Sequence, residues 1–345
     1  MTASLRLAER VDTEPMDTEP MDTVPAWVPA DPGGAMVRLA DVPAPRPRPH
    51  EALVAVEAFS VNRGETLRLE EPAATWRPGK DVAGTVAKAA ADGSGPPAGT
   101  RVVGHPPGGG WSTRVAVPVA DLAVLPPEVP FVTAAALPLA GITALRLVRR
   151  AGWLAGRRLL VTGASGGVGH YVVELAAAAG AEVTAISASA ERGERLLALG
   201  AAEVRSDLPA GGPPFDVVME SVGGETLRSA LLLLRGGGQL LWFGQAGGEP
   251  VALDFFEFWR GPVEASITHV DYTQGERSFG EDLATLVGLV ASGRLHPEIG
   301  VVRPWTETPE VIAMLRGRRV RGNAVLVLPP RRQADDPPRR RHHAH

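Results

Sequence analysis

The sequence predicts an α/β protein in which a mainly β region precedes a segment of alternating strands and helices. Short apolar runs separated by glycine- and proline-rich turns fill residues 24–130, which is typical of a β domain. From residue 158 onward, strand-like runs recur at intervals long enough to hold a helix, which is typical of parallel β-α-β units. A chain of 345 residues is long enough for these two domains.

The first region contains several short runs that alternate or cluster apolar residues as strands do. We expect strands near residues 26–28 and over residues 51–59, 81–86, 101–104 and 111–117. Apolar residues with helical spacing then predict a helix over residues 132–147 and a second helix after Gly152.

A glycine-rich turn between a strand-like run and a helical pattern is the central motif of the chain. It reads Ala164-x-Gly166-x-x-Gly169, the dinucleotide-binding fingerprint with alanine in place of the first glycine. Gly166 would let the backbone approach a pyrophosphate, and Gly169 would let the helix pack closely on the strand. The unpaired N–H groups at the helix start would then face the phosphates. Further strand-like runs over residues 182–187, 215–220 and 238–244 favour a Rossmann unit over a purely structural glycine turn.

The rest of the chain predicts two amphipathic helices, a last strand and two disordered ends. The helices are expected over residues 281–292 and 310–316, and the strand over residues 324–328, from where it returns to the first region. Residues 1–23 are acidic, rich in proline and repetitive, so we expect a disordered extension, with a misplaced start codon as the alternative. Residues 329–345 carry many arginines and histidines, and we interpret them as a solvated basic tail rather than a metal or nucleic-acid site.

The bulk composition excludes several classes of function. Cysteine is absent, which excludes disulfides, cysteine nucleophiles and cysteine-ligated zinc or iron–sulfur sites. With 35 basic and 39 acidic residues, the net charge of −4 gives no reason to expect nucleic acid or an anionic membrane as a partner. No apolar run reaches membrane-spanning length and no signal peptide is visible, so we expect a cytoplasmic protein.

Six segments together resemble the medium-chain dehydrogenase/reductase superfamily and, within it, its zinc-independent quinone oxidoreductase branch. They are residues 60–65, 78–84, 99–102, 136–144, 163–169 and 321–326. The resemblance covers residues 24–328. It implies a GroES-like, mainly β catalytic domain over residues 24–138 and 274–328 and a Rossmann domain over residues 139–273. It also implies a homodimer.

The positions that bind the catalytic zinc in alcohol dehydrogenases of this superfamily carry other residues here. Asn62 stands where those enzymes have a cysteine, and Lys80-Asp81 stands where they have His-Glu. Their four-cysteine structural zinc loop has no counterpart. Because zinc needs three or four Cys, His or carboxylate ligands, we predict no metal. His105, in a loop near the predicted cleft, is interpreted as a satisfied or solvated residue rather than a ligand.

Residues 162–169 also fit the Thr-Gly-x-x-x-Gly-x-Gly pattern of short-chain dehydrogenases. Those enzymes use a Tyr-x-x-x-Lys pair as the catalytic acid. The only tyrosines, Tyr171 and Tyr272, are followed four residues later by Leu175 and Glu276, and both lysines precede the glycine loop. The sequence therefore excludes that family.

The end of the second Rossmann strand favours NADPH over NADH. An NAD enzyme of this type places Asp or Glu there to accept from the ribose hydroxyls, whereas this chain has Ser187. Hydroxyls and a guanidinium can hold a 2′-phosphate, so we predict NADPH contacts from Ser187, Ser189 and Arg192. The alternative is that Arg192 begins a solvated helix and Glu191 meets the ribose.

The resemblance implies further cofactor contacts. Thr143 would approach the nicotinamide, and Val270 and Asn323 would close over its carboxamide side. The remaining contacts would be Ala164, Ser165, Gly166, Gly167 and Val168 of the glycine loop and Val222, Phe243, Gly244 and Gln245 after the third and fourth Rossmann strands.

Without zinc to polarise a carbonyl, the substrate must already be a good hydride acceptor, such as a quinone or an activated enone. We predict direct hydride transfer from NADPH, with Asn62 as the first choice of hydrogen-bond donor to the substrate and Tyr272 as the second. Asn62 could instead satisfy local loop backbone. Leu67 replaces a tyrosine that is frequent in the family, which weakens the case for a quinone. The alternatives are an enoyl or alkenal double-bond reductase of a biosynthetic pathway and a non-catalytic NADPH-binding regulatory protein.

Overall fold

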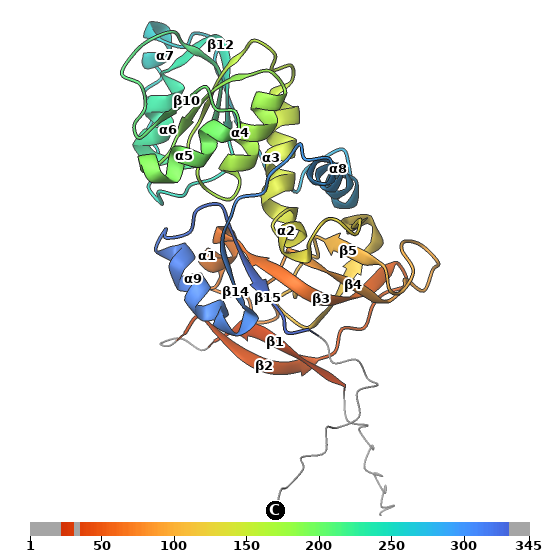
Figure 1. Ribbon diagram of the computed structural model, residues 1–345. Helices are drawn as coiled ribbons and strands as arrows, with labels where there is room; N and C mark the ends of the chain where they lie inside the picture. The colour runs from red at the N-terminus through yellow and green to blue at the C-terminus, as the bar shows by residue number, and fades with distance from the viewer. Residues whose placement is uncertain (1–21, 31–34, 331–345) are drawn as a thin grey trace, which may run out of the picture.

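The computed structural model describes residues 22–30 and 35–330. Figure 1 shows two parts stacked one above the other, a mainly β part below and an α/β part above. The long helices α3 (Pro138–Ala151) and α8 (Phe279–Ala291) lie where the two parts meet. The termini predicted to be disordered fall outside the described residues, apart from residues 22–23, where β1 begins, and residues 329–330.

The lower part is built around a seven-stranded sheet that joins distant segments of the chain. Its order is β14-β15-β3-β4-β5-β7, and β6 also pairs with β3. The last strand, β15 (Asn323–Val327), runs antiparallel to β3 (Glu51–Val61), so the C-terminal segment completes the sheet that the N-terminal segment begins. The other strands are β4 (Val82–Lys88), β5 (Arg101–Gly104), β6 (Arg114–Pro118), β7 (Leu122–Val124) and β14 (Ile299–Pro304), and β1 (Thr23–Pro29) forms a separate pair with β2 (Val37–Pro43).

A buried aromatic pair fixes the end of β3 from which the candidate site begins. The fully buried Trp111 stacks on Phe59 with ring centroids 6.0 Å apart, and its indole N–H donates to the carbonyl of Ser60 at 2.9 Å. These contacts hold the chain rigidly just before Asn62. The helices of this part are α1 (Arg63–Arg68), α2 (Phe131–Ala135) and α9 (Thr308–Arg316), with short 3₁₀ turns η1 (Val119–Asp121) and η2 (Trp305–Glu307).

The upper part is a six-stranded parallel sheet in the order β10-β9-β8-β11-β12-β13. Successive strand residues point to opposite faces, and both faces are buried as in other parallel sheets. Leu159 of β8 joins the core beneath α3 and α4, whereas Leu160 joins the core beneath α6. The strands are β8 (Arg158–Val161), β9 (Glu182–Ile186), β10 (Glu203–Arg205), β11 (Phe215–Glu220), β12 (Leu234–Trp242) and β13 (Ser266–His269), and the helices are α4 (Gly169–Ala178), α5 (Ala190–Ala198), α6 (Gly224–Leu231) and α7 (Glu257–Arg260).

Two helix predictions before the glycine loop were wrong. The helix expected over residues 132–147 is two helices, because Pro138 has no N–H for an intrahelical bond and instead occupies the first turn of α3. The helix expected after Gly152 is absent. Gly152 takes a positive φ of 78° at the end of α3, and a turn leads directly into β8.

None of the helices in residues 22–30 and 35–330 is both long enough and apolar enough to cross a membrane.

Candidate functional site

The glycine loop is packed too closely to admit side chains at two of its glycines. Gly163 has a positive φ of 60°, which glycine adopts without strain. A Cβ on Gly169 would lie 2.5 Å from the Gly163 carbonyl oxygen and 2.6 Å from the Cα of Ala164. The first turn of α4 therefore sits directly on the end of β8. This is the backbone geometry that presents helix N–H groups to a phosphate.

The residues expected after the third and fourth Rossmann strands lie at the carboxyl edge of the parallel sheet. Val222 follows β11, and Phe243, Gly244 and Gln245 follow β12. The two loops contact each other, since a Cβ on Gly223 would lie 2.8 Å from Cγ of Gln245. Val270 follows β13, and its N–H donates to the carbonyl of Trp242 at 2.8 Å. Parallel sheets bind their ligands at this edge.

The lower part reaches the glycine loop through the beginning of β15. The N–H of Gly322 donates to the carbonyl of Ser165 at 3.0 Å, and a Cβ on Gly167 would lie 3.0 Å from Oδ1 of Asn323. Thr143, predicted near the nicotinamide, is buried in α3, where its hydroxyl donates to the carbonyl of Leu139 at 2.6 Å.

The three residues predicted to contact the 2′-phosphate each make a hydrogen bond within the protein. The hydroxyl of Ser187 donates to the carbonyl of Ser189, and the Ser189 hydroxyl caps α5 by accepting from the N–H of Arg192. The Arg192 guanidinium donates to the carbonyls of Arg318 and Val320, both at 2.6 Å. Those bonds satisfy hydrogens of the guanidinium, and no carboxylate in residues 22–30 and 35–330 pairs with its positive charge.

Two arginines that sequence reasoning missed join Arg192 at the boundary between the two parts. Arg63 and Arg318 both donate to the carbonyl of Ala246, at 2.9 and 2.8 Å. Burial and then the charges of Arg318 and Arg316 lower the pKa of Arg63 below its ordinary value of 12.5. The Nε atoms of Arg63 and Arg192 are buried and have no hydrogen-bond partner in the part of the chain that the structure describes. The only signal was the run of arginines over residues 316–321, which carries no spatial information on its own.

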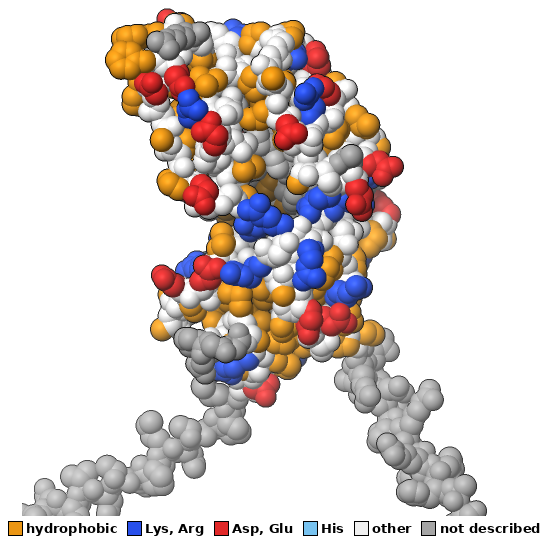
Figure 2. Space-filling model, turned by 90° about the vertical axis from the view of Figure 1, so that its left-hand side faces the viewer, with side chains coloured by type: hydrophobic (Ala, Val, Ile, Leu, Met, Phe, Trp, Pro, Cys, Tyr) orange, Lys and Arg blue, Asp and Glu red, His pale blue; other side chains and the backbone are white. Residues whose placement is uncertain are grey.

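Figure 2 shows Lys and Arg side chains gathered where the surface is hollowed between the two parts. Within the described residues, Arg63, Arg192 and Arg318 form no salt bridge with a carboxylate. Arg318 also takes a left-handed conformation with φ of 56° just after α9, a position where glycine is usual. A phosphate group is the kind of partner that such a cluster binds. The glycine loop and these arginines together fit a dinucleotide.

A second polar cluster surrounds the carboxylate of Asp81, which is fully buried. Its Oδ2 accepts from the Ser60 hydroxyl at 2.5 Å and from Nδ2 of Asn62 at 2.7 Å. Its Oδ1 accepts from the N–H of Leu139 at 2.9 Å and lies 3.3 Å from Nδ1 of His105. Every side of the carboxylate is therefore occupied by a group of the protein.

Tyr272 connects this cluster to Lys80. Nζ of Lys80 donates to the Tyr272 hydroxyl at 3.0 Å, and Nε2 of His105 lies 3.3 Å from the same oxygen. His105 is buried, and its Nδ1 faces the carboxylate of Asp81. Burial raises the pKa of Tyr272 above 10.0, and the ammonium of Lys80 opposes that rise. The chain thus forms a tyrosine–lysine pair from residues 192 positions apart, which no local motif could reveal.

Glu65 lies beneath Asn62 and ties the cluster to the chain around Lys80. Its Oε2 accepts from the backbone N–H and Nδ2 of Asn62, both at 3.2 Å, and its Oε1 accepts from the N–H of Gly79 at 2.7 Å and of Lys80 at 3.1 Å. Burial and then the nearby Asp81 raise the pKa of Glu65 to about 7. The amide hydrogens of Asn62 are thus engaged by Asp81, Glu65 and Ser60 within the protein.

Arg146 of α3 holds the loop that carries Tyr272. Its Nη1 donates to the Tyr272 carbonyl at 2.5 Å, its Nη2 to the carbonyl of Arg277 at 2.7 Å, and its Nε to the fully buried carboxylate of Asp282 at 2.6 Å. Arg149 adds a second ion pair to Asp282. A Cβ on Gly275 would lie 2.4 Å from Arg146, so the loop follows the guanidinium closely.

The side chains around Asp81 do not suit zinc. Asn62 and Lys80 stand at two positions where the zinc alcohol dehydrogenases of the superfamily have zinc ligands. Across the parts of the chain that the structure describes, no three His, Asp or Glu side chains are grouped so that they could hold a metal ion.

Comparison with known proteins settles the family. The family model for zinc-binding dehydrogenases matches residues 167–287. The quinone oxidoreductase of Rattus norvegicus is 32% identical over 225 residues, which cover 60% of this chain and 68% of the rat protein. The chain belongs to the zinc-independent, quinone oxidoreductase-like branch of the medium-chain dehydrogenase/reductase superfamily. As a member of it, the protein is an NAD(P)H-dependent oxidoreductase.

Two further proteins are similar to this chain. A mycobacterial protein whose structure was solved with NADPH is 25% identical, with a TM-score of 0.79 over 88% of this chain and 99% of that one. The spectinabilin polyketide synthase system protein NorB of Streptomyces orinoci is 34% identical over 318 residues, which cover 86% of this chain. The chain spans 14% of the length of NorB.

Proposed function

We propose that this protein is a zinc-independent, NADPH-dependent reductase that transfers hydride to an electron-poor acceptor, a quinone or an activated enone. The observation that carries the proposal is the hydrogen-bonded set of Tyr272, Lys80 and His105, which joins a proton donor to a buried carboxylate. When bound, NADPH supplies a hydride to the acceptor. The residues of the chain then have to supply a proton and hold the acceptor in place.

Tyr272 is the proton donor in this proposal. Hydride adds to the β-carbon of an enone, and the hydroxyl of Tyr272 gives its proton to the resulting enolate, so that the C=C bond becomes saturated. Lys80 stabilises the tyrosinate that forms, because its ammonium lies 3.0 Å from the oxygen. Nε2 of His105 lies 3.3 Å from the same oxygen, and Asp81 orients the imidazole that positions Tyr272. The tyrosinate then regains its proton from water. Since the amide of Asn62 is held by Asp81 and Glu65, Asn62 acts on the substrate only if one of these bonds opens.

The arginine cluster supports NADPH rather than NADH. Arg63, Arg192 and Arg318 bring three positive charges together, and no carboxylate of the described residues pairs with them. Arg192 follows the end of β9, where NAD enzymes place an acidic residue. A 2′-phosphate would neutralise part of that charge, whereas the ribose hydroxyls of NADH would not.

The second candidate function is the reduction of an enoyl double bond in a biosynthetic pathway. The similarity to NorB, a protein of a polyketide synthase system, favours it, and so does the presence of a proton donor that can saturate a C=C bond. The remaining alternative, a non-catalytic NADPH-binding regulatory protein, predicts no hydride transfer to any acceptor.

We also propose a homodimer that forms along the outer edge of the upper sheet. β13 is the outermost strand of the order, so one row of its backbone N–H and C=O groups has no neighbouring strand in that sheet. Ile267 of this strand is 41% exposed, and Phe255 and Trp259, shortly before it, are 75% and 76% exposed. Such an edge is self-complementary under a two-fold axis. A cytoplasmic location stays a prediction of the composition.

The proposal is tested by NADPH oxidation with chelator-treated protein, supplied separately with a simple quinone and an α,β-unsaturated ketone. Turnover of either acceptor after chelation supports the zinc-independent reductase. Transfer of deuterium from labelled NADPH to the β-carbon of the ketone assigns double-bond reduction. If NADPH binds and no acceptor among quinones, enones and enoyl thioesters is reduced, the proposal of a reductase is wrong.

A further inference from the structure

His170 lies in the first turn of α4, directly after the glycine loop, and the proposed mechanism does not use it. The ring is buried, and each of its two nitrogens contacts a backbone group. Nδ1 lies 3.0 Å from the carbonyl oxygen of Gly166, and Nε2 accepts from the backbone N–H of Glu298 at 3.0 Å. Because a carbonyl only accepts and an N–H only donates, Nδ1 carries the hydrogen and the ring is neutral. Burial lowers the pKa of His170 to about 4, which favours the same form.

The two contacts of His170 join the two parts of the molecule. Gly166 belongs to the glycine loop of the upper part, whereas Glu298 directly precedes β14 of the lower part. Glu174, one turn after His170 on α4, holds the same lower segment. Its carboxylate accepts from the backbone N–H of His296 at 2.9 Å and lies 2.5 Å from Nδ1 of that residue. One face of α4 therefore holds the segment that leads into β14.

Glu298 in turn contacts Asn323, the residue expected over the carboxamide of the nicotinamide. Its carbonyl accepts from the backbone N–H of Asn323 at 2.8 Å and from Nδ2 at 3.4 Å. Its carboxylate pairs with Arg321 of the lower part at 2.8 Å and with Arg195 of α5, in the upper part, at 3.3 Å. A Cβ on Gly322 would lie 2.2 Å from the Glu298 carbonyl oxygen, so the two segments are in direct contact. Glu298 thus sets where Asn323 lies relative to the glycine loop.

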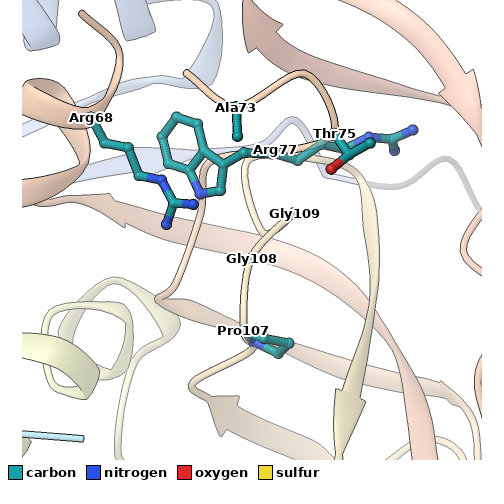
Figure 3. A pocket seen from close by; sticks show the side chains of 8 residues that line it. Arg68, Ala73, Thr75, Arg77, Pro107, Gly108 and Gly109 are labelled. Carbon is teal, nitrogen blue, oxygen red and sulfur yellow. The ribbon is translucent and has the colours of Figure 1, made fainter. Parts of the chain in front are cut away.

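The side chains around a surface cavity of the lower part do not converge in this way. The cavity has a volume of about 410 Å³ and shares no lining residue with the contacts of Glu298. Figure 3 shows Arg68 and Arg77 directed to opposite sides of Trp76. This geometry gives no site in which both guanidiniums bind one anion. At Glu298, by contrast, side chains from both parts of the molecule meet at one residue.

We propose that His170 is a positioning residue for the cofactor, because through Glu298 it holds Asn323 beside the glycine loop so that both ends of NADPH bind together. The inference rests on the proposed function and deepens its cofactor site. The glycine loop and the arginine cluster serve the phosphates. Asn323 serves the nicotinamide end, which it reaches only while Glu298 keeps its amide beside Gly167. The ordering of this segment is complete before NADPH binds, so binding does not bear its entropic cost.

The test measures the dissociation constants of NADPH and of 2′-phospho-ADP-ribose, a fragment that lacks the nicotinamide. An asparagine amide can replace Nδ1 of a histidine and a glutamine oxygen can replace Nε2, so two variants separate the two bonds. His170→Asn keeps the donor to Gly166 and loses the contact with Glu298. It should weaken NADPH binding about tenfold and leave the fragment within about twofold. His170→Gln keeps the contact with Glu298, so both ligands should change by the same factor.

Two further variants and a control separate positioning from a merely structural role. Arg195, whose side chain is 41% exposed, makes the other contact between Glu298 and the upper part. Arg195→Gln should therefore shift the ratio of the two dissociation constants in the same direction as His170→Asn. In the background of Asn323→Ala, His170→Asn should have no further effect on NADPH binding, since both changes remove the same contact. His50→Asn, at an exposed histidine before β3, is the control and should change neither constant.

The outcomes separate this inference from the proposed function. Both ligands bind without an acceptor, so their dissociation constants decide the role of His170, whereas reduction of an enone by the wild-type protein tests the reductase alone. Equal weakening of both ligands in His170→Asn, no weakening, or an additive effect with Asn323→Ala would overturn the inference. An unchanged ratio in Arg195→Gln would do so even if His170→Asn does not fold. If the wild-type protein binds neither ligand, the inference and the proposed function are both wrong.

Discussion

The two ends of the interdomain boundary present opposite chemistry. At the cofactor end, Arg63, Arg192 and Arg318 bring positive charge together, and no carboxylate among the described residues pairs with them. At the other end, Asp81 is surrounded by donors, and its cluster reaches Tyr272 through His105. The first end offers charge that suits a phosphate, whereas the groups of the second end are hydrogen-bonded to one another. In the proposed mechanism, the first end binds the cofactor and the second end supplies the proton.

The largest expected effect on kcat is at the end that contains Asp81 and Tyr272. Tyr272→Phe removes the hydroxyl but keeps the ring, so kcat with an enone should fall about 10²- to 10⁴-fold, the usual contribution of a positioned acid. The affinity for NADPH, measured by fluorescence titration, should stay at the wild-type value. Wild-type turnover in this variant would remove Tyr272 from the mechanism.

Lys80→Met tests the role of Tyr272 as proton donor through the pH dependence of kcat. Tyr272 donates only while protonated, so activity is present below its pKa and is lost as the pH rises through it. Burial places that pKa above 10.0, and Lys80 opposes this rise, while Asp81 and Glu65 add to it. Removing Lys80 should therefore move the alkaline limb of kcat to higher pH and lower the plateau. An unmoved limb would show that another group limits the rate there.

At the cofactor end, Arg318→Gln should weaken NADPH binding about tenfold, as expected for a lost charge-assisted hydrogen bond. Comparison with NADH locates the contact. A 2′-phosphate contact lowers the preference for NADPH over NADH, whereas a pyrophosphate contact weakens both cofactors equally. No change for either cofactor would show that the cluster is structural. Arg38→Gln, which changes an exposed arginine of β2, serves as the control for the loss of one surface charge.

Asn62→Ala tests the residue that the sequence analysis gave as the first choice of hydrogen-bond donor to the substrate. Its amide donates to Asp81 and Glu65, so the truncation leaves these buried carboxylates short of a donor, and turnover should fall more than NADPH affinity. Steady-state kinetics and NADPH titration separate the two quantities. Equal losses, or none, would contradict a role of Asn62 near the reacting groups.

The smallest effect on turnover is expected far from both ends. Trp259→Ser should shift the protein toward a monomer in sedimentation experiments while kcat with a small enone stays within about twofold, because the exposed ring contacts neither polar cluster. A monomeric wild-type protein would rule out the proposed edge interface.

The sequence predicted the upper part well because its signals are local. β8, the glycine loop and α4 follow one another directly, so the fingerprint and the alternation of strands and helices sufficed to recognise a Rossmann unit. The break at Pro138 and the turn after Gly152 were missed, since apolar spacing continues across both positions. Boundaries of this kind depend on single residues rather than on periodicity.

The sequence by itself determined the fold class and the branch of the superfamily. The signals were the motif around Asn62, the glycine loop, and the residues Asn62 and Lys80 in place of zinc ligands. Only the tertiary structure decided what Lys80 and Arg318 do. Lys80 meets Tyr272 across 192 residues, and Arg318 shares the Ala246 carbonyl with Arg63. The physical reason is that a side chain's charge and hydrogen bonds act over a few ångströms in space, and the folded sheets set which distant segments come that close.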